Sequence, residues 1–219
     1  MSRNLRSRLT LAATLAMFAF TVLLITRNDE LVFRDEGRLV VKADPADANA
    51  VVFYWRSEVD VPMARRFAEA FEMWKFDADR IVIDLHSPGG VIREGEAVIR
   101  VIEHMKRTHV VDTRVRARRA CYSMCVPIFL QGEERTAAPS ARFMFHEPRA
   151  YDYFTGEPVN EPAFERDMAS QRFFDRYFVD SPMDPVWRDR LAQEWRGRDV
   201  WRSGRELTAE GSNIVTVLE

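Results

Sequence analysis

The sequence has no surplus of charge of either sign. Its 32 lysines and arginines are intermixed with 34 aspartates and glutamates, which leaves a formal net charge of -2. A surface of this kind creates no extended positive field that would attract nucleic acid. The one local cluster of basic residues comprises Arg114, Arg116, Arg118 and Arg119. We therefore expect no nucleic-acid partner.

Other absences narrow the class of protein further. The chain has no low-complexity run and no repeat of solenoid period, which excludes a disordered or repeat protein. Its four histidines show no metal-ligand spacing, so neither a metal site nor a cofactor is expected: they are His86, His104, His109 and His146. Of the 219 residues, those beyond an apolar leader suit a single domain.

That leader is the one long uncharged stretch. Residues 9–26 carry no charge and are nearly all apolar, which is about the length of a membrane-spanning helix. Three arginines precede it and two acids follow soon after it, namely Arg3, Arg6, Arg8, Asp29 and Glu30. The positive-inside rule then puts the N-terminus in the cytoplasm and the rest in the periplasm or an equivalent extracytoplasmic space. Small residues typical of a cleavage site are lacking, which favours a signal anchor over a cleaved leader.

The remaining chain alternates between strand and helix patterns. Predicted strands cover residues 50–55, 79–85, 110–115 and 141–145, and predicted helices cover 61–74, 91–105 and 122–130. The tail adds helices at 161–178 and 185–196, strands at 199–202 and 213–218, and between these a short helix capped by Thr208. Such alternation indicates an α/β fold with helices on a mainly parallel sheet. We expect a cytoplasmic tip and anchor over 1–28, a connector with an edge strand over 29–47, and one domain over 48–219.

The first motif with chemical potential is Ser87-Pro88-Gly89-Gly90-Val91, between a predicted strand and a predicted helix. Two glycines allow a tight turn and expose backbone N–H groups at a helix N-terminus, where partial positive charge collects. Gly89, Gly90 and Val91 are therefore candidates for binding an oxyanion or a substrate. An ordinary strand-to-helix turn uses the same residue types.

Two further residues complete a pattern. Ser123 lies at the start of an apolar helix, where the N–H of Met124 can donate to developing negative charge, although a capping serine is the alternative. His146 directly follows the apolar strand 141–145. It is a candidate base, and a packed core histidine is the alternative. A glycine turn, a serine and a histidine in this order are what an oxyanion hole, a nucleophile and a base require.

These segments resemble the ClpP-type serine peptidases of the ClpP/crotonase superfamily. The matching pieces are IDLHSPGGVIREGEAVI (83–99), YSM (122–124) and ARFMFHEP (141–148), and the resemblance extends over residues 51–217. It implies a spiral of β-β-α units with a mainly parallel sheet flanked by helices. It also implies that Ser123 is the nucleophile, that His146 is the general base, and that the N–H groups of Gly90 and Met124 are the oxyanion donors. Substrate would align as an added strand near residues 89–93.

The third member of a catalytic triad does not follow the family pattern. The family's aspartate aligns with Trp195. Glu194, one position earlier, is the first candidate and Asp199 the alternative, against a dyad with no carboxylate. The two cysteines, Cys121 and Cys125, flank Ser123 at a spacing that allows a disulfide. Two buried small residues are the other interpretation.

The function implied is that of a membrane-anchored, extracytoplasmic serine hydrolase, an ATP-independent endopeptidase acting on peptides or proteins through an acyl-enzyme. Homo-oligomerisation is compatible with the resemblance, whereas an ATPase partner is not expected outside the cytoplasm. The competing hypothesis is a catalytically degenerate ClpP-like domain that binds peptides or scaffolds a membrane complex. Crotonase-type chemistry on thioesters fits a serine-histidine pair poorly. A serine-lysine mechanism is disfavoured because no lysine follows Lys106.

Overall fold

The computed structural model describes residues 39–150 and 159–219 of the chain. The predicted membrane segment at 9–26, and the connector before residue 39, lie outside these residues. Within the two described ranges, no helix has both the length and the apolar character needed to cross a membrane.

The larger of two sheets has six strands in the order β1-β2-β3-β4-β6-β9. The strands are β1 (Val40–Ala43), β2 (Ala50–Trp55), β3 (Arg80–Leu85), β4 (Val110–Val115), β6 (Arg135–Ala137) and β9 (Val217–Leu218). All neighbours run parallel except β1, which pairs antiparallel with β2 at the sheet edge. The α/β prediction is confirmed, with β1 as the predicted edge strand.

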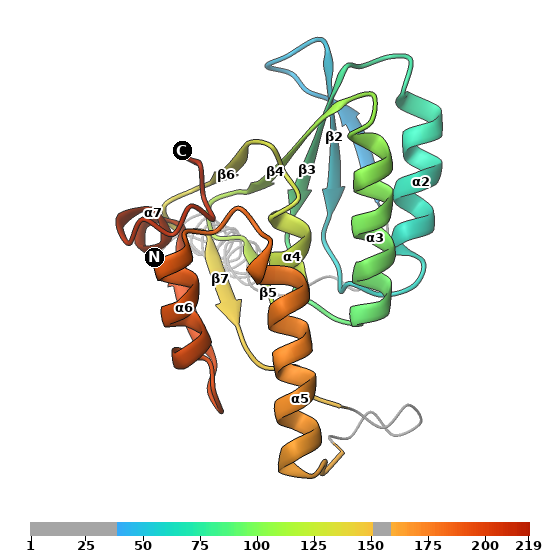
Figure 1. Ribbon diagram of the computed structural model, residues 1–219. Coiled ribbons are helices and arrows are strands. Elements are labelled where there is room, and N and C mark those ends of the chain that lie inside the picture. Colours follow the sequence, from blue (N-terminus) through green and yellow to red (C-terminus); the bar gives the residue numbers. More distant parts are fainter. Residues whose placement is uncertain (1–38, 151–158) are drawn as a thin grey trace, which may run out of the picture. The chain divides into compact units, whose positions relative to one another are not determined.

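Two helices cover one face of this sheet because each connects consecutive parallel strands. They are α2 (Met63–Trp74), after β2, and α3 (Ile92–Met105), after β3, and they lie side by side in Figure 1. The fully buried Phe67 of α2 contacts Phe53 and Trp55 of β2, with ring centroids 5.8 and 5.9 Å apart. Burying one such aromatic side chain contributes about 2–3 kcal/mol, so the apolar spacing seen in the sequence holds this layer together.

The smaller sheet has three strands, in the order β5-β7-β8. These are β5 (Ala120–Tyr122), β7 (Arg142–Phe145) and β8 (Val200–Ser203). β5 is parallel to β7, and β8 is antiparallel to it. The predicted helix over 122–130 is shorter, because residues up to Tyr122 pair as β5 and only Cys125–Phe129 forms helix α4. Pairing of β5 with β7 overrides the helical pattern of the local sequence. Strand β6 was also not predicted.

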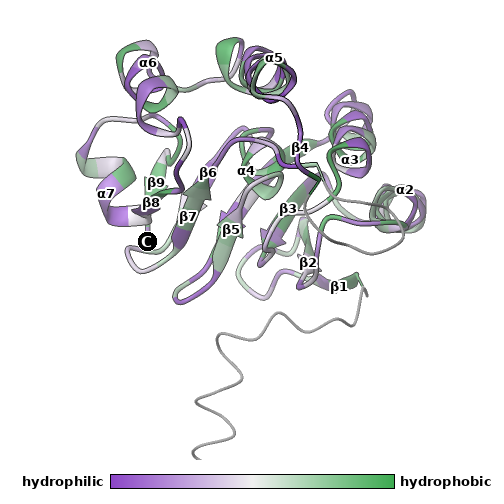
Figure 2. Ribbon diagram, turned by 90° about the horizontal axis from the view of Figure 1, so that it is seen from below, coloured by the Kyte–Doolittle hydropathy of each residue, from purple (hydrophilic) through white to green (hydrophobic). Residues whose placement is uncertain are grey.

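The tail is mainly helical and carries an aromatic cluster. Helix α5 (Ala163–Phe174) continues into the π-helical turn η1 (Asp175–Val179), and α6 (Pro185–Glu194) and α7 (Gly204–Ala209) follow. The cluster joins Phe173, Phe174, Phe178 and Trp195, all buried. Figure 2 shows α2, α3, α5 and α6 along one side of the strands.

The start of α7 corrects one prediction. Ser203, not Thr208, caps the helix, because Ser203 and Glu206 form a reciprocal capping box. Thr208 lies inside the helix and donates its hydroxyl to the carbonyl of Gly204.

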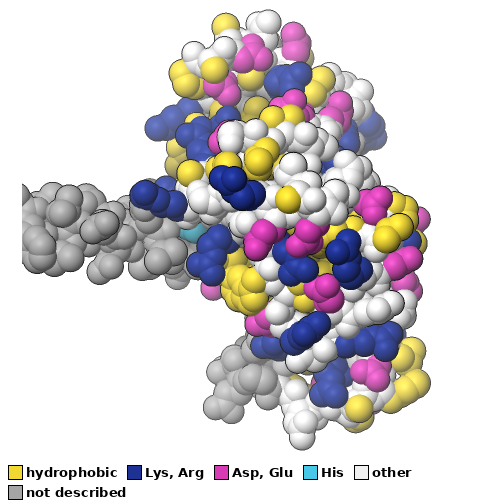
Figure 3. Space-filling model, turned by 90° about the vertical axis from the view of Figure 1, so that its left-hand side faces the viewer, with side chains coloured by type: hydrophobic (Ala, Val, Ile, Leu, Met, Phe, Trp, Pro, Cys, Tyr) yellow, Lys and Arg dark blue, Asp and Glu magenta, His cyan; other side chains and the backbone are white. Residues whose placement is uncertain are grey.

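The surface agrees with the balanced composition. Basic and acidic side chains lie interspersed over the face shown in Figure 3. Such a face offers no single-sign field to a polyanion.

Candidate active site

Ser123 and His146 follow the ends of two neighbouring parallel strands. In the register of β5 and β7, Tyr122 lies opposite Met144. Ser123 continues this pairing, because its N–H donates to the carbonyl of Met144 at 2.9 Å. Parallel strands end at the same edge of a sheet, so the serine and the histidine lie at one edge.

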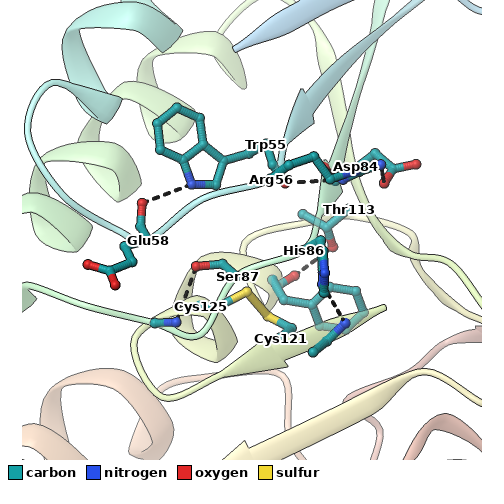
Figure 4. Close-up of a disulfide and its surroundings, with 12 residues drawn as sticks. Trp55, Arg56, Glu58, Asp84, His86, Ser87, Thr113, Cys121 and Cys125 are labelled. Carbon is teal, nitrogen blue, oxygen red and sulfur yellow. Dashed lines mark hydrogen bonds and ion pairs between the residues drawn. A yellow bond between two sulfur atoms is a disulfide. The ribbon is translucent and has the colours of Figure 1, made fainter. Parts of the chain in front are cut away.

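The turn that carries Ser123 is closed covalently. A disulfide joins Cys121 to Cys125, with Cα atoms 5.2 Å apart (Figure 4). Between them, Ser123 has a φ of +52°, in the left-handed region that residues with a side chain rarely adopt. The N–H of Val126 then donates to the carbonyl of Ser123 at 2.9 Å, which begins α4. The nucleophile candidate therefore lies in an unusual backbone conformation inside a small covalent ring.

The glycine turn contacts this serine directly. Ser87 pairs with β5, since its N–H donates to Ala120 at 2.9 Å and its carbonyl accepts from Tyr122 at 3.0 Å. This pairing places Gly89, at a φ of +92°, so that an added Cβ would lie 2.6 Å from the Cβ of Ser123. No side chain fits at that distance, so only glycine allows the turn to approach the serine this closely.

The two predicted oxyanion donors lie on either side of Gly89. A Cβ on Gly89 would be 3.1 Å from the nitrogen of Met124, and Gly90 is the next residue along the chain. Neither the N–H of Gly90 nor that of Met124 donates to a residue in the described part of the chain. The N–H of Val91 is different, because it donates to Val59 at 2.8 Å. Gly90 and Met124 can therefore serve as oxyanion donors, while Val91 holds the turn in place.

The imidazole of His146 is half-buried and hydrogen-bonded to the main chain. Its Nδ1 lies 2.6 Å from the carbonyl oxygen of Glu147. Burial lowers the pKa of His146, and the nearby charge of Arg149 lowers it further, whereas Asp199 and Glu147 raise it. A lowered pKa keeps the imidazole neutral near pH 7, as a general base requires.

In the described residues, no hydrogen bond joins this imidazole to the hydroxyl of Ser123. Such bonds are often long in unliganded enzymes and tighten when substrate binds. Their absence here is compatible with a role in proton transfer.

The two carboxylates predicted as the third member of a triad form ion pairs with arginines instead. Glu194 binds Arg202 at 2.9 Å, and Asp199 binds Arg149 at 3.0 Å. Within the described ranges, neither carboxylate accepts a hydrogen bond from His146. The side chain of Trp195, the aligned position, is 3% exposed and packs against Phe174, with ring centroids 5.0 Å apart. Among the described residues, no carboxylate is hydrogen-bonded to the imidazole.

A buried carboxylate that the sequence analysis missed lies two residues before His86. Asp84 is fully buried and binds Arg56 at 2.5 Å, Arg114 at 3.0 Å and Arg116 at 2.5 Å. Two members of the arginine cluster therefore have a structural role at the ends of β3 and β4. The isolated aspartate in the apolar run IVIDL was the available signal, but its partners depend on strand register.

His86 fixes the start of β5 from the same segment. Its Nδ1 accepts the N–H of Ala120 at 3.0 Å, as drawn in Figure 4. Burial lowers the pKa of His86 to about 4, and the charges of Arg119 and Arg56 lower it in the same direction. His86 is thus a neutral, structural histidine at neutral pH.

A polar cavity of about 810 Å³ lies between α5 and α6. Glu147, Pro148 and Arg149 line one part of it. Residues 39–150 and 159–219 contain no group of histidine, cysteine or acidic side chains suited to holding a metal ion. The cavity therefore borders the segment that follows His146, but neither His146 nor Ser123 is among its lining residues.

A family model described as Clp protease matches residues 48–162, more than half of the chain. The chain belongs to the Clp protease family. Among solved structures, this Clp protease is similar to a mutant of ClpP1 from Listeria monocytogenes, with 19% identity and a TM-score of 0.59. The match covers 78% of this chain and 91% of the other, and it shows a shared fold. No curated protein matches the sequence.

The family membership supports a serine peptidase. The glycine turn, Ser123 and His146 all fall inside the matched residues, whereas Glu194 and Asp199 lie beyond them. The part of the site that the family match covers is thus the serine, the histidine and the oxyanion donors.

Proposed function

We propose that this Clp protease is a serine peptidase in which Ser123 is the nucleophile and His146 the general base. The observation that carries the proposal is the close approach of Gly89 to Ser123, where an added Cβ would lie 2.6 Å from the serine Cβ. That approach supports a role for the glycine turn next to the serine side chain. The histidine follows the neighbouring strand, so nucleophile, base and donors share one edge.

The reaction follows from this arrangement. His146 takes the proton of the Ser123 hydroxyl as the oxygen attacks the carbonyl carbon of the scissile peptide bond. The N–H groups of Gly90 and Met124 bind the negative oxygen of the tetrahedral intermediate. The imidazolium then gives its proton to the leaving amine. A water molecule, deprotonated by the same imidazole, hydrolyses the acyl-enzyme and restores the serine.

The substrate class is an extended peptide or protein segment. Residues 89–91 form the glycine turn and its extended exit beside the nucleophile, before α3 begins at Ile92, and a peptide can align along this segment as an added strand. The polar cavity bordered by Glu147, Pro148 and Arg149, the residues after His146, has room for charged or polar side chains of such a substrate. Clp proteases form oligomers, and we propose self-association for this chain as well, without an ATPase partner.

The setting is a membrane-anchored domain outside the cytoplasm. The uncharged run at residues 9–26 and the arginines before it support the anchor and its orientation. The disulfide between Cys121 and Cys125 supports an oxidising compartment, because such bonds are rare in the cytosol. Exported or membrane proteins are then the natural substrates of an ATP-independent endopeptidase.

A second function has one observation in its favour. Since no carboxylate contacts the imidazole among the described residues, the domain fits a peptide-binding or scaffold role if His146 is not a competent base. The two functions differ in whether Ser123 is activated.

The deciding experiment is labelling of the purified full-length chain with a serine-directed fluorophosphonate. Wild type should be labelled, and Ser123→Ala and His146→Ala should not. Ser140→Ala is the matched control, because Ser140 is an exposed serine on the turn before β7, and it should be labelled like wild type. A folded wild type without labelling would contradict the hydrolase and favour the binding role.

A further inference from the structure

The proton on His146 is held by a main-chain oxygen. In a serine-histidine-acid triad, the acid accepts a hydrogen bond from Nδ1–H and so leaves Nε2 free to take the serine proton. Here the atom next to Nδ1, at 2.6 Å, is the carbonyl oxygen of Glu147. A carbonyl oxygen can only accept, so Nδ1 carries the proton and Nε2 is unprotonated. This is the tautomer that a triad acid would select.

The nearby carboxylates have other partners that hold them in place. Arg202 binds Glu194 at 2.9 Å and also Glu210 at 2.8 Å, so Glu194 belongs to a network between α6, β8 and the end of α7. Arg149 binds Asp199 at 3.0 Å, which compensates one of the carboxylate charges that act on the histidine. Moving Asp199 to His146 would leave Arg149 without this partner, and moving Glu194 would remove one of the two carboxylates that bind Arg202.

The side chain of Glu147 fixes the position of that carbonyl. Its Oε2 accepts the N–H of Gly197 at 2.9 Å, and Gly197 has a φ of +69° just after α6. The same turn is anchored by the buried Trp195. On the other side, Pro148 restricts the backbone of Glu147 to extended conformations. Both the side chain and the backbone of Glu147 are therefore restricted in conformation.

We propose that Glu147 is the positioning residue of this site: its main-chain carbonyl holds the Nδ1 proton of His146, and its side chain fixes that carbonyl on Gly197. The inference rests on the proposed function, because it concerns the residue assigned there as base. Among the described residues, the catalytic unit is then a dyad of Ser123 and His146. Glu194 and Asp199 are then dispensable for proton transfer.

The first test is the rate constant of fluorophosphonate labelling for the full-length chain. Glu147→Ala loses the bond to Gly197, and labelling should fall about tenfold or more, since small misplacements of a base are costly. Glu147→Gln should restore the rate, because its amide oxygen still accepts from Gly197. Its lost charge should also lower the apparent pKa of His146 in the pH profile, since the Glu147 carboxylate raises that pKa.

The matched controls are Glu194→Gln and Asp199→Asn, which should label within about threefold of wild type at pH 8. Loss of a true triad acid lowers the rate by roughly 10⁴-fold, so the two outcomes are well separated. A loss of that size in either control, with Glu147→Ala near wild type, would overturn the proposal. Circular dichroism would establish that each variant is folded.

A second measurement does not depend on activity. The ¹⁵N resonances of the histidine rings report the tautomer directly, and those of His146 are assigned by their absence from His146→Ala. We expect the Nδ1–H tautomer in Ser123→Ala, with a mixture of tautomers after the further change Glu147→Ala. An Nε2–H tautomer in Ser123→Ala would overturn the inference. An unlabelled wild type with the Nδ1–H tautomer would contradict the proposed function while supporting the positioning role.

Discussion

The two sides of the site are held by different forces. On the nucleophile side, a disulfide closes the turn around Ser123, and Gly89 contacts the serine from the neighbouring segment. On the base side, His146 is held by one bond to a carbonyl, and that carbonyl is fixed by one bond from Gly197 to Glu147. The first set of constraints is covalent and steric, and the second consists of hydrogen bonds and charges.

This difference matches what each side has to do. Ser123 must keep a φ of +52°, a conformation that costs free energy and persists only where the surroundings impose it. His146 must gain and lose a proton, so its surroundings have to tune a pKa. The nucleophile side should therefore respond to changes of volume and covalent bonding, and the base side to pH and charge.

The largest effect should come from adding one methyl group on the nucleophile side. In Gly89→Ala the new Cβ would meet the Ser123 Cβ at 2.6 Å, at a φ of +92°, so the turn or the serine must move. We expect fluorophosphonate labelling to fall by about a hundredfold or more, because the reacting groups lose their alignment.

Gly211→Ala is a control that introduces backbone strain without a steric contact, so it separates the two effects combined in Gly89→Ala. Gly211 has a φ of +67°, and nothing lies within 4 Å of its added Cβ. That variant should lose about 1 kcal/mol of unfolding free energy and keep its labelling rate. Equal labelling of the two variants would show that the contact between Gly89 and Ser123 does not position the nucleophile.

A smaller effect should follow from opening the covalent ring. In the double variant Cys121→Ala, Cys125→Ala, the loss of a five-residue loop closure should lower the free energy of unfolding by roughly 2 kcal/mol. Labelling should fall by about tenfold, because the turn then samples conformations other than that of Ser123 in the native site. Urea unfolding and labelling rates measure the two effects. A double variant that is less stable but labels like wild type would show that packing alone places the serine.

The nucleophile side and the base side also differed in how far the sequence could predict them. Strand and helix periodicity located β2, β3 and β4 and the helices between them, because these elements bury regular apolar faces. The glycine turn and Ser123 were evident because chemistry requires particular residue types there. The short strand β5 was missed, since its three residues merge into the apolar run that follows and their state is decided by pairing with β7.

The base side depends on contacts that no side-chain pattern reveals. His146 was predicted from its place after an apolar strand, but the partner of its Nδ1 is a backbone oxygen, which every residue has. The search for an acid pointed to Glu194 and Asp199 because they are close in the sequence to the aligned position. Whether a carboxylate faces a histidine or an arginine depends on how β8 and α6 pack, and the sequence alone does not show that packing.

The pH dependence of labelling sharpens the comparison on the base side. Labelling requires the neutral imidazole, and burial lowers the pKa of His146. The rate should therefore fall, as pH decreases, at a midpoint below the ordinary histidine value of about 6.5. Arg149→Gln should raise that midpoint and Asp199→Asn should lower it, since these two charges act in opposite directions. Shifts of the same sign in both variants, or a wild-type midpoint above the ordinary value, would contradict this account.

The smallest effect should be one of stability, without a change in chemistry, at the start of β5. His86 has a pKa of about 4 in the folded protein, below the unfolded value. The unfolded chain therefore binds the proton first, so the folded state loses stability as pH falls from about 6.5 towards 4, by at most about 1.4 kcal/mol per pH unit from this one group. His86→Asn can still accept the Ala120 N–H but does not titrate, so its unfolding free energy should fall less between pH 7 and pH 5 than that of wild type. If the unfolding free energy falls equally in His86→Asn and in wild type, His86 is not the group that titrates. If it falls less in His86→Asn and the midpoint of labelling is unchanged, pH acts on the nucleophile side through folding alone.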